Sequence, residues 1–360
     1  MKKIIVLFLL ILVYVRCSTY EEEKHLVYDK HEDTEILTLA SGARVEKRGN
    51  QYVYLGDLLL SDKQLQGLGQ YGDVFAFKDK SRYKGVFKPE YGIVSLRLPL
   101  ESRKQLEGSY TTKVVALPQG THWAMVRFTF DSNLNELQIA AIQRAMSELE
   151  ELTNVRFYNA TGEPTGNPSL GINYNYITFY SSNVNNSQIG SVGGQQIINL
   201  VSFNSKTIMH EILHALGLFH EQSRPDRDTY IDVNVVNVAS ENRHNFDRVT
   251  QNYLTLGAFD FNSIMLYDSY AFSINGEPTL TKKDGSVFFD NNQLSELDRS
   301  YVNTYYIPYK SNPNGTRILI DNQVYKSDNS LMTQLERDNL ERKLNGEPPI
   351  WDGNGKPPMQ

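Results

Sequence analysis

The sequence of 360 residues has little cysteine, little excess charge and few long apolar runs. Its single cysteine, Cys17, excludes an internal disulfide. With a net charge of -6 and no basic stripe interleaved with aromatic residues, nucleic acid is not an expected partner. The 12-residue apolar run at residues 4–15 is too short to span a bilayer comfortably, so no membrane span is expected. A hydrophobic content of 40% over this length allows one large domain with additional segments.

The N-terminus has the features of a secretory signal peptide. Lys2 and Lys3 precede the apolar run, as in an exported protein, and a buried N-terminal helix or strand is the alternative. Two fates are open to Cys17. It is either discarded with the signal peptide or carries the lipid anchor of a bacterial lipoprotein, for which Tyr14 and Arg16 are poor neighbours. We therefore predict export, with a secreted protein or a membrane-anchored lipoprotein as the outcome.

A short segment contains three of the seven histidines of the chain. His210 and His214 are four positions apart, which on a helix places them roughly 40° apart around the axis and about 6 Å apart along it. Gly217 tolerates the left-handed conformation that ends a helix, so the chain can turn back and deliver His220. Three neutral imidazoles suit zinc and leave a fourth position open for water. Glu211 can take a proton from that water.

An amphipathic helix with surface histidines is the alternative, because a lone HExxH pattern can arise by chance. The third histidine at the right distance, behind a glycine at the right place, favours zinc binding. The residues therefore predict one Zn2+ per chain with His210, His214 and His220 as ligands and Glu211 as the general base.

The extended pattern HExxHxxGxxH resembles the metzincin group of zinc peptidases. The longer stretch that also contains Glu221, Arg224 and residues 226–228 is similar to the astacin signature HExxHxxGFxHExxRxDRD. Leu218 stands where that signature has phenylalanine, which replaces one apolar residue by another.

Two further stretches carry the same resemblance. Residues 263–267 are similar to the astacin methionine turn S-I-M-H-Y, with Leu266 in place of histidine. In that family the methionine forms an apolar floor under the metal, and the tyrosine is a zinc ligand that swings away to stabilise the oxyanion. The resemblance thus implies these roles for Met265 and Tyr267. Residues 187–200 resemble the glycine-containing loop and edge strand of the family.

Residues 293–306 resemble the closing helix of the family, so the resemblance covers about residues 115–306. The lack of cysteine in this region is similar to the disulfide-free bacterial members. The resemblance implies an α+β fold of the metzincin type, with a twisted mixed sheet and an active-site helix above an irregular C-terminal subdomain. It also implies zinc-dependent hydrolysis of peptide bonds in protein or peptide substrates.

An earlier stretch, Tyr54-Leu-Gly-Asp57, resembles the propeptide motif F-x-G-D of the family, with tyrosine in place of phenylalanine. Taken alone, it would be a strand followed by a turn, or the start of a helix. In the family the aspartate coordinates zinc and displaces the catalytic water. The resemblance therefore implies a latent zymogen with Asp57 as its inhibitory switch.

Two other positions concern maturation and specificity. The glutamate at the position of Glu221 pairs with the newly formed N-terminus in the family, and a solvated surface glutamate is the alternative. Lys282 aligns with a position that borders the pocket for the residue after the cleaved bond. An ammonium there would favour Asp or Glu in the substrate, whereas a solvated loop lysine beside Lys283 is the alternative.

Residue periodicity predicts where the helices and strands lie. Helices are expected at 134–152 with Asn133 as the cap, from Asn204 or Ser205 to Gly217, at 294–305 and at 330–344; strands are expected at 124–130, 154–158, 176–180 and 196–200. Residues 18–50 are polar and charged with little periodicity, so they are expected to be exposed or loosely ordered.

We therefore divide the chain into a signal peptide (1–17), a propeptide (18–107), a catalytic domain (108–306) and a C-terminal extension of unknown role (307–360). The charged segment 101–109 suits maturation cleavage.

Two other functions are compatible with a zinc site. A non-catalytic binding protein could keep a structural zinc, but structural sites close all four positions, usually with cysteine, and do not need Glu211. A different metzincin branch would lack the residues that come after His220 in this chain.

Overall fold

The structure is a computed structural model of the chain. It describes residues 34–76, 122–123, 125–167, 172–191, 193–251, 253, 255–310 and 319–350. The expected signal peptide with Cys17 and the expected cleavage segment lie outside these residues.

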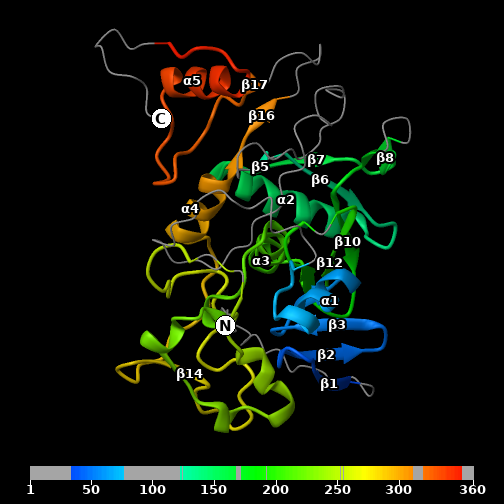
Figure 1. Ribbon diagram of the computed structural model, residues 1–360, viewed down its shortest axis with the longest axis vertical. Helices are drawn as coiled ribbons and strands as arrows, with labels where there is room; N and C mark the ends of the chain where they lie inside the picture. The colour runs from blue at the N-terminus through cyan, green and yellow to red at the C-terminus, as the bar shows by residue number, and fades with distance from the viewer. Residues whose placement is uncertain are drawn as a thin grey trace, which may run out of the picture. The chain divides into compact units, whose positions relative to one another are not determined.

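A nine-stranded mixed sheet is the framework of the described chain (Figure 1). Its strands are β1 Thr34–Thr38, β2 Arg44–Arg48, β3 Gln51–Tyr54, β4 Leu58–Leu60, β6 Met125–Phe130, β7 Arg156–Asn159, β10 Tyr176–Ser181, β11 Asn186–Gln188 and β12 Gln195–Leu200. Their order is β1-β2-β3-β4-β11-β12-β10-β6-β7. The last four strands pair in parallel, whereas β11 runs antiparallel to β12. The expected strands at 124–130, 154–158, 176–180 and 196–200 are thus confirmed, with small shifts of their ends.

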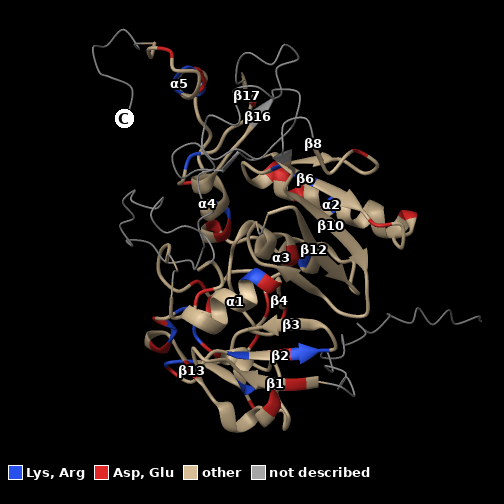
Figure 2. Cartoon of the chain, turned by 45° about the vertical axis from the view of Figure 1, so that its right-hand side comes forward, with Lys and Arg blue, Asp and Glu red and all other residues tan. Residues whose placement is uncertain are grey.

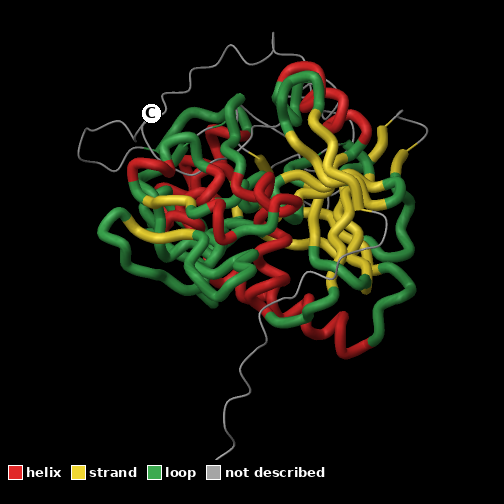
Figure 3. Tube along the Cα trace, turned by 90° about the horizontal axis from the view of Figure 1, so that it is seen from below, coloured by secondary structure: helices red, strands yellow, loops and turns green. Residues whose placement is uncertain are grey.

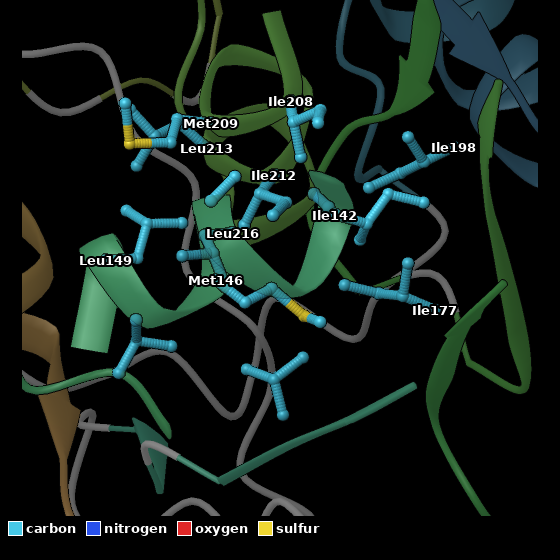
Figure 4. Close-up of a cluster of buried hydrophobic side chains, with 14 of the residues drawn as sticks. Ile142, Met146, Leu149, Ile177, Ile198, Ile208, Met209, Ile212, Leu213 and Leu216 are labelled. Atoms are coloured by element: carbon cyan, nitrogen blue, oxygen red, sulfur yellow. The ribbon is translucent and has the colours of Figure 1, made fainter. Parts of the chain in front are cut away.

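Two helices, α2 (Glu136–Leu152) and α3 (Ser205–Leu216), share one apolar core with the sheet. In β12 every second residue is buried, so one face of the strand contributes to this core. Figure 4 shows part of it, with side chains of Ile142, Met146, Leu149, Ile177, Ile198, Met209, Ile212, Leu213 and Leu216. Each fully buried side chain of this size contributes about 1.5–3 kcal/mol through the hydrophobic effect. The packing fixes α3, the helix that carries the histidine motif.

The start of α2 differs from the prediction by two residues. Asn135, not Asn133, is the cap: its side chain accepts from the amide of Gln138, and the Gln138 side chain accepts from the Asn135 amide. Asn133 instead exchanges two hydrogen bonds with the backbone of Ser181 at the end of β10. A contact with a distant strand therefore decides which asparagine caps the helix.

The expectation of a loosely ordered segment up to residue 50 is wrong for residues 34–50. β1 to β4 form an antiparallel meander, and β4 joins the central sheet by parallel pairing with β11. Helix α1 (Asp62–Tyr71) comes next, with Ser61 and Gln64 forming a capping box. Charged residues dominate β2 (Figure 2), and Val45 is its fully buried apolar residue. The strand forms because neighbouring strands pair with it, which local periodicity does not reveal.

The chain after α3 is mostly irregular, as expected. It contains the short 3-10 helices η4 Glu221–Ser223, η5 Arg227–Thr229, η6 Val235–Asn237 and η7 Ser240–Phe246, and the paired strands β13 Ile231–Val233 and β14 Leu280–Lys282. A separate apolar cluster, which includes Phe246, Phe259 and Phe288, forms the interior of this part. Strands and loop-rich parts occupy different regions in Figure 3.

The closing helix α4 (Glu296–Tyr305) and the helix α5 (Gln334–Leu344) confirm two further predictions. Small strand pairs complete the fold: β15 Tyr306–Ile307 with β5 His122–Trp123, β16 Tyr309–Lys310 with β17 Leu319–Ile320, and β8 Gly166–Asn167 with β9 Ile172–Asn173. Among the described residues, no helix has the length and apolar character needed to cross a membrane.

Candidate metal centre and active site

The caps of α3 define where its histidines lie. The side chain of Asn204 accepts a hydrogen bond from the amide of Thr207 and starts the helix. Gly217 ends it in the left-handed conformation, with φ 112°, and donates its amide to the carbonyl oxygens of His214 and Leu213. The chain then reverses and brings His220 back beside the helix.

Three imidazole nitrogens converge in the structure. The Nε2 atom of His214 lies 3.0 Å from Nε2 of His210 and 3.3 Å from Nε2 of His220, and the remaining pair is 3.3 Å apart. His214 and His220 are fully buried, and 15% of the His210 side chain is exposed. Four zinc ligands at about 2.0–2.1 Å in a tetrahedron lie roughly 3.3 Å from one another. The observed spacing therefore fits a zinc ion at the centre.

The opposite ring nitrogens support the same assignment. The Nδ1 of His210 is 2.9 Å from the carbonyl oxygen of Ile264, and that of His214 is 2.7 Å from the carbonyl oxygen of Leu218. A carbonyl accepts only from a protonated nitrogen, so the Nε2 atoms of these two neutral rings carry lone pairs. Lone pairs that face each other at this distance repel unless a cation lies between them. Burial also lowers the pKa of His214 to about 4, which keeps its ring neutral.

Asp57 completes the group of possible ligands. Its Oδ2 lies 3.1 Å from Nε2 of His220 and 3.5 Å from that of His210, and its Oδ1 lies 3.4 Å from that of His214. The ligand atoms of all four residues lie within 4.8 Å of one another. A carboxylate and three imidazole nitrogens are a donor set that zinc accepts, and the ion would bind each of them in its deprotonated form.

The backbone before Asp57 requires glycine. Gly56 has φ 101°, and a Cβ atom there would collide with the phenol oxygen of Tyr267. Leu55 also has a positive φ, of 52°, and its carbonyl oxygen accepts a hydrogen bond from the Tyr267 phenol at 3.3 Å. The amide of Ser187 donates to the carbonyl oxygen of Asp57 at 3.1 Å. The Tyr-Leu-Gly-Asp stretch therefore crosses the centre between Tyr267 and β11.

Glu211 is adjacent to this centre and is only 2% exposed. Burial, and then the charge of Asp57, raise its pKa well above the ordinary value. Its Oε2 atom has no hydrogen-bond partner among the described residues. Such a carboxyl group has a high proton affinity and is suited to acid–base chemistry.

The methionine turn lies against the same centre. Met265 is 1% exposed and belongs to the main apolar core. Its carbonyl oxygen accepts from the amide of Glu221 at 2.9 Å, directly after His220. The ring of Tyr267 lies 4.6 Å from that of His220, between their centroids. The turn therefore contacts the His220 segment, and through the carbonyl oxygen of Ile264 it also contacts His210 on α3.

Glu221 is not a solvated surface residue, because it is only 2% exposed. It accepts from the Arg224 guanidinium at 3.0 Å and from the amide of Asp260 at 2.8 Å. Burial raises the pKa of Glu221 to about 8, although the charge of Arg224 lowers it. Arg224 is itself 1% exposed, so Glu221 and Arg224 form a buried pair.

Lys282 lies at the end of β14, with its ammonium 4.8 Å from the centre of the Phe261 ring. Lys283 instead pairs with Asp232 at 2.5 Å. The prediction for Lys282 as a specificity residue stays a prediction, and the two lysines are now distinguished by their partners.

Sequence reasoning did not single out Asp298, which is fully buried and hydrogen-bonded to the methionine turn. A signal for it was present in the Ser295-x-x-Asp298 spacing, which predicts a capping box but not a second partner.

Comparison with known proteins agrees with the geometry. Zinc metalloproteinase nas-14 of Caenorhabditis elegans is 33% identical over 187 residues, which cover 50% of this chain and 36% of that protein. Flavastacin of Elizabethkingia meningoseptica is 34% identical over 209 residues, covering 56% and 42%. The chain thus spans less than half the length of these relatives. A solved structure, the hatching enzyme zinc-protease HCE-1 of Oryzias latipes (medaka fish), is 29% identical with a TM-score of 0.44 and covers 50% of this chain and 88% of that chain.

A mixed sheet, a helix with two histidines, a third histidine after a glycine turn and a methionine turn define the metzincin class of zinc peptidase folds. The model of the peptidase family described as Astacin matches residues 116–307, more than half of the chain. The protein belongs to the astacin family.

Proposed function

We propose that this protein is an exported, zinc-dependent endopeptidase that is made as a latent zymogen. The observation that carries the proposal is the convergence of three imidazole Nε2 atoms, 3.0–3.3 Å apart, with the buried carboxyl group of Glu211 next to them in the same helix. His210, His214 and His220 would be the zinc ligands. A structural site would have no use for a buried glutamate whose Oε2 atom has no hydrogen-bond partner in the described part of the chain, so these features favour catalysis over simple binding.

Zinc, when bound, supplies a Lewis acid that polarises the scissile carbonyl and lowers the pKa of water. Glu211 would take the proton of the attacking water and later pass it to the leaving amine. The phenol of Tyr267 would donate to the carbonyl oxygen of the substrate as negative charge develops there. That phenol now donates to the carbonyl oxygen of Leu55, so it becomes available when this long hydrogen bond is broken. Met265 would form the apolar floor of the centre.

Latency in this proposal has two parts. Asp57 places its carboxylate at the position that the substrate and water need, within 3.5 Å of three Nε2 atoms. β4 separately occupies the edge of β11, where Leu58 and Leu59 pair with Ser187 and Gln188. An extended substrate would use that edge, since a free strand edge binds extended peptides.

Maturation would cleave the chain between a propeptide (18–107) and a catalytic domain that begins near residue 108. The buried pair of Glu221 and Arg224 supports the resemblance-based role of Glu221, because Arg224 also pairs with Asp226. The new N-terminal ammonium would provide a second cation. The site of cleavage and the fate of Cys17 concern residues outside the described chain.

Specificity is the finest part of the proposal. An ammonium at Lys282 would favour an acidic residue directly after the cleaved bond, by about 0.5–1 kcal/mol at such a partly exposed position. Cleavage profiling of a peptide library with the parent enzyme, Lys282→Ala and Lys283→Ala tests it. The acidic preference should disappear only in Lys282→Ala. A parent enzyme without that preference, or an equal loss in both variants, would end this assignment.

The overall proposal is tested by incubating the purified full-length chain, before and after limited proteolysis, with a denatured protein substrate. We expect cleavage only after proteolysis, its loss with a chelator and its return with added zinc. Sequencing the products and the N-terminus of the enzyme then gives the bond preference and the maturation site. If the processed chain binds zinc but cleaves no substrate, the protein is a non-catalytic zinc-containing binding protein.

A further inference from the structure

Asp298, on the closing helix, is connected to the methionine turn by two hydrogen bonds. The hydroxyl of Ser263 donates to its Oδ1 at 2.7 Å, and the amide of Ile264 donates to its Oδ2 at 2.9 Å. The Ser263 hydroxyl also accepts from the amide of Met265 at 3.0 Å. Because Asp298 is fully buried, these bonds are shielded from water and determine the orientation of the turn.

The methionine turn in its fixed orientation contacts one of the histidines, His210. The carbonyl oxygen of Ile264, the residue whose amide Asp298 binds, lies 2.9 Å from Nδ1 of His210. An unbroken chain of hydrogen bonds therefore runs from Asp298 through one peptide residue to a ring that faces the metal position.

His210 depends on this contact more than the other two histidines do. Its side chain is 15% exposed, whereas those of His214 and His220 are enclosed on all sides. Packing alone therefore restricts the His210 ring least. A hydrogen bond to Nδ1 fixes both the tautomer and the direction of the Nε2 lone pair.

We propose that Asp298 is a positioning residue of the zinc centre, acting through Ile264 on His210. The inference rests on the zinc ligands proposed above but not on peptidase activity. A purely structural explanation exists, because Asp298 also closes the capping box of α4 with Ser295. In that case Asp298 would stabilise the helix and leave the metal untouched.

The two explanations are separated by the zinc affinity of the full-length chain, measured by competition with a chromophoric chelator. Ser263→Ala removes one bond between turn and helix, Asp298→Ala removes both, and Ser295→Ala removes the hydroxyl of the cap and leaves the turn contacts intact. We expect Asp298→Ala to weaken zinc binding by about 10- to 100-fold, as loss of an outer partner typically does, and Ser263→Ala by a smaller factor in the same direction. Ser295→Ala should lower the melting temperature and change the affinity less than about twofold.

A second readout is the visible absorption of the cobalt-substituted protein, which reports ligand geometry and should change in Ser263→Ala but not in Ser295→Ala. If Asp298→Ala fails to fold, Ser263→Ala decides. Normal affinity and spectrum in a folded Asp298→Ala or in Ser263→Ala, or equal weakening in Ser295→Ala, would overturn the inference. A parent chain that binds no zinc would instead overturn the proposed function.

Discussion

Two segments that lie outside the family match, residues 34–76 and 319–350, are attached to the catalytic part in different ways. We refer to them as the N-terminal segment and the C-terminal segment. The first joins the central sheet, and its residue Asp57 lies at the metal centre. The second contacts α4 and the chain just after α2, and the hydrogen bonds that attach it involve none of the proposed ligands.

The N-terminal segment binds mainly through apolar contacts and backbone pairing. Tyr54, Leu55, Leu58 and Phe75 belong to a buried cluster that the catalytic part completes with Ile189, Phe219 and Val249. The side chain of Gln64 donates to the carbonyl oxygen of Ile189 at 2.9 Å. These contacts lie beside the metal centre but do not involve it, so they determine how firmly the segment docks.

The C-terminal segment binds mainly through polar side chains. Asn154, just after α2, exchanges two hydrogen bonds with the backbone of Tyr325. Arg156 donates to Asp321 at 2.9 Å, and the Ser300 hydroxyl donates to the carbonyl oxygen of Ser327. The C-terminal segment has fewer buried apolar residues than the N-terminal segment, namely Ile320 and Val324. Helix α5 has no buried residue.

Docking and inhibition are therefore separate properties of such segments. Both segments dock, but only the N-terminal one carries a carboxylate into the group of histidines. We expect changes in the C-terminal segment to alter stability without altering latency, and changes at Asp57 to do the reverse.

The largest expected effect concerns the metal centre itself and involves neither of the two segments. Glu211→Gln removes the base but keeps the shape of the side chain, so the processed enzyme should retain zinc and lose at least about a hundredfold in turnover. Peptidase assays and metal analysis of the same preparation measure both quantities. Near-normal turnover with one zinc per chain would contradict the role of Glu211.

A smaller effect tests the C-terminal attachment. Asn154→Ala leaves the amide of Tyr325 and two carbonyl groups without a partner in a buried position, which should cost about 1–3 kcal/mol. Thermal or urea unfolding of the unprocessed chain measures this loss. Asn339→Ala in α5 is the matched control, because its side chain also exchanges two hydrogen bonds with a backbone, that of Ile350, but in an exposed place; it should change stability by less than about 0.5 kcal/mol. Peptidase activity in unprocessed Asn154→Ala would show that the C-terminal segment also controls latency.

The smallest effect concerns a salt bridge of the N-terminal segment. Arg44 and Asp247 form a bidentate pair, but their side chains are 35% and 33% exposed. Arg44→Ala should therefore weaken docking by less than about 1 kcal/mol. Recovery of activity on dilution of the cleaved enzyme measures docking, with Lys47→Ala as the control. A far larger loss would mean that charge, not the apolar cluster, dominates the attachment.

Much of the centre was predictable because its information is local in sequence. The spacing of His210 and His214 needs only a helix, and Gly217 supplies the turn that returns His220. The strand Met125–Phe130 was equally readable, since its sequence is rich in β-forming residues.

The remainder depends on contacts that no local pattern records. β2 reads as a charged stretch and becomes a strand only because β1 and β3 pair with it. Asn135 caps α2 in place of Asn133, because the side chain of Asn133 is hydrogen-bonded to the backbone of Ser181. The sequence left a solvated surface position open for Glu221, and only the fold shows that Arg224 and Asp260 bind it in a buried place.

The measurement that tests the central claim most directly is the rate at which uncleaved Asp57→Ala hydrolyses a short peptide, compared with the uncleaved parent chain. Intact mass confirms that neither chain has been processed. An alanine methyl group cannot bind zinc, so the variant should hydrolyse the short peptide while the parent chain is silent, although more slowly than the cleaved enzyme because β4 still pairs with β11. A variant that stays silent until the N-terminal segment is removed would show that β4 and the apolar cluster suffice for latency, and that Asp57 is not the switch.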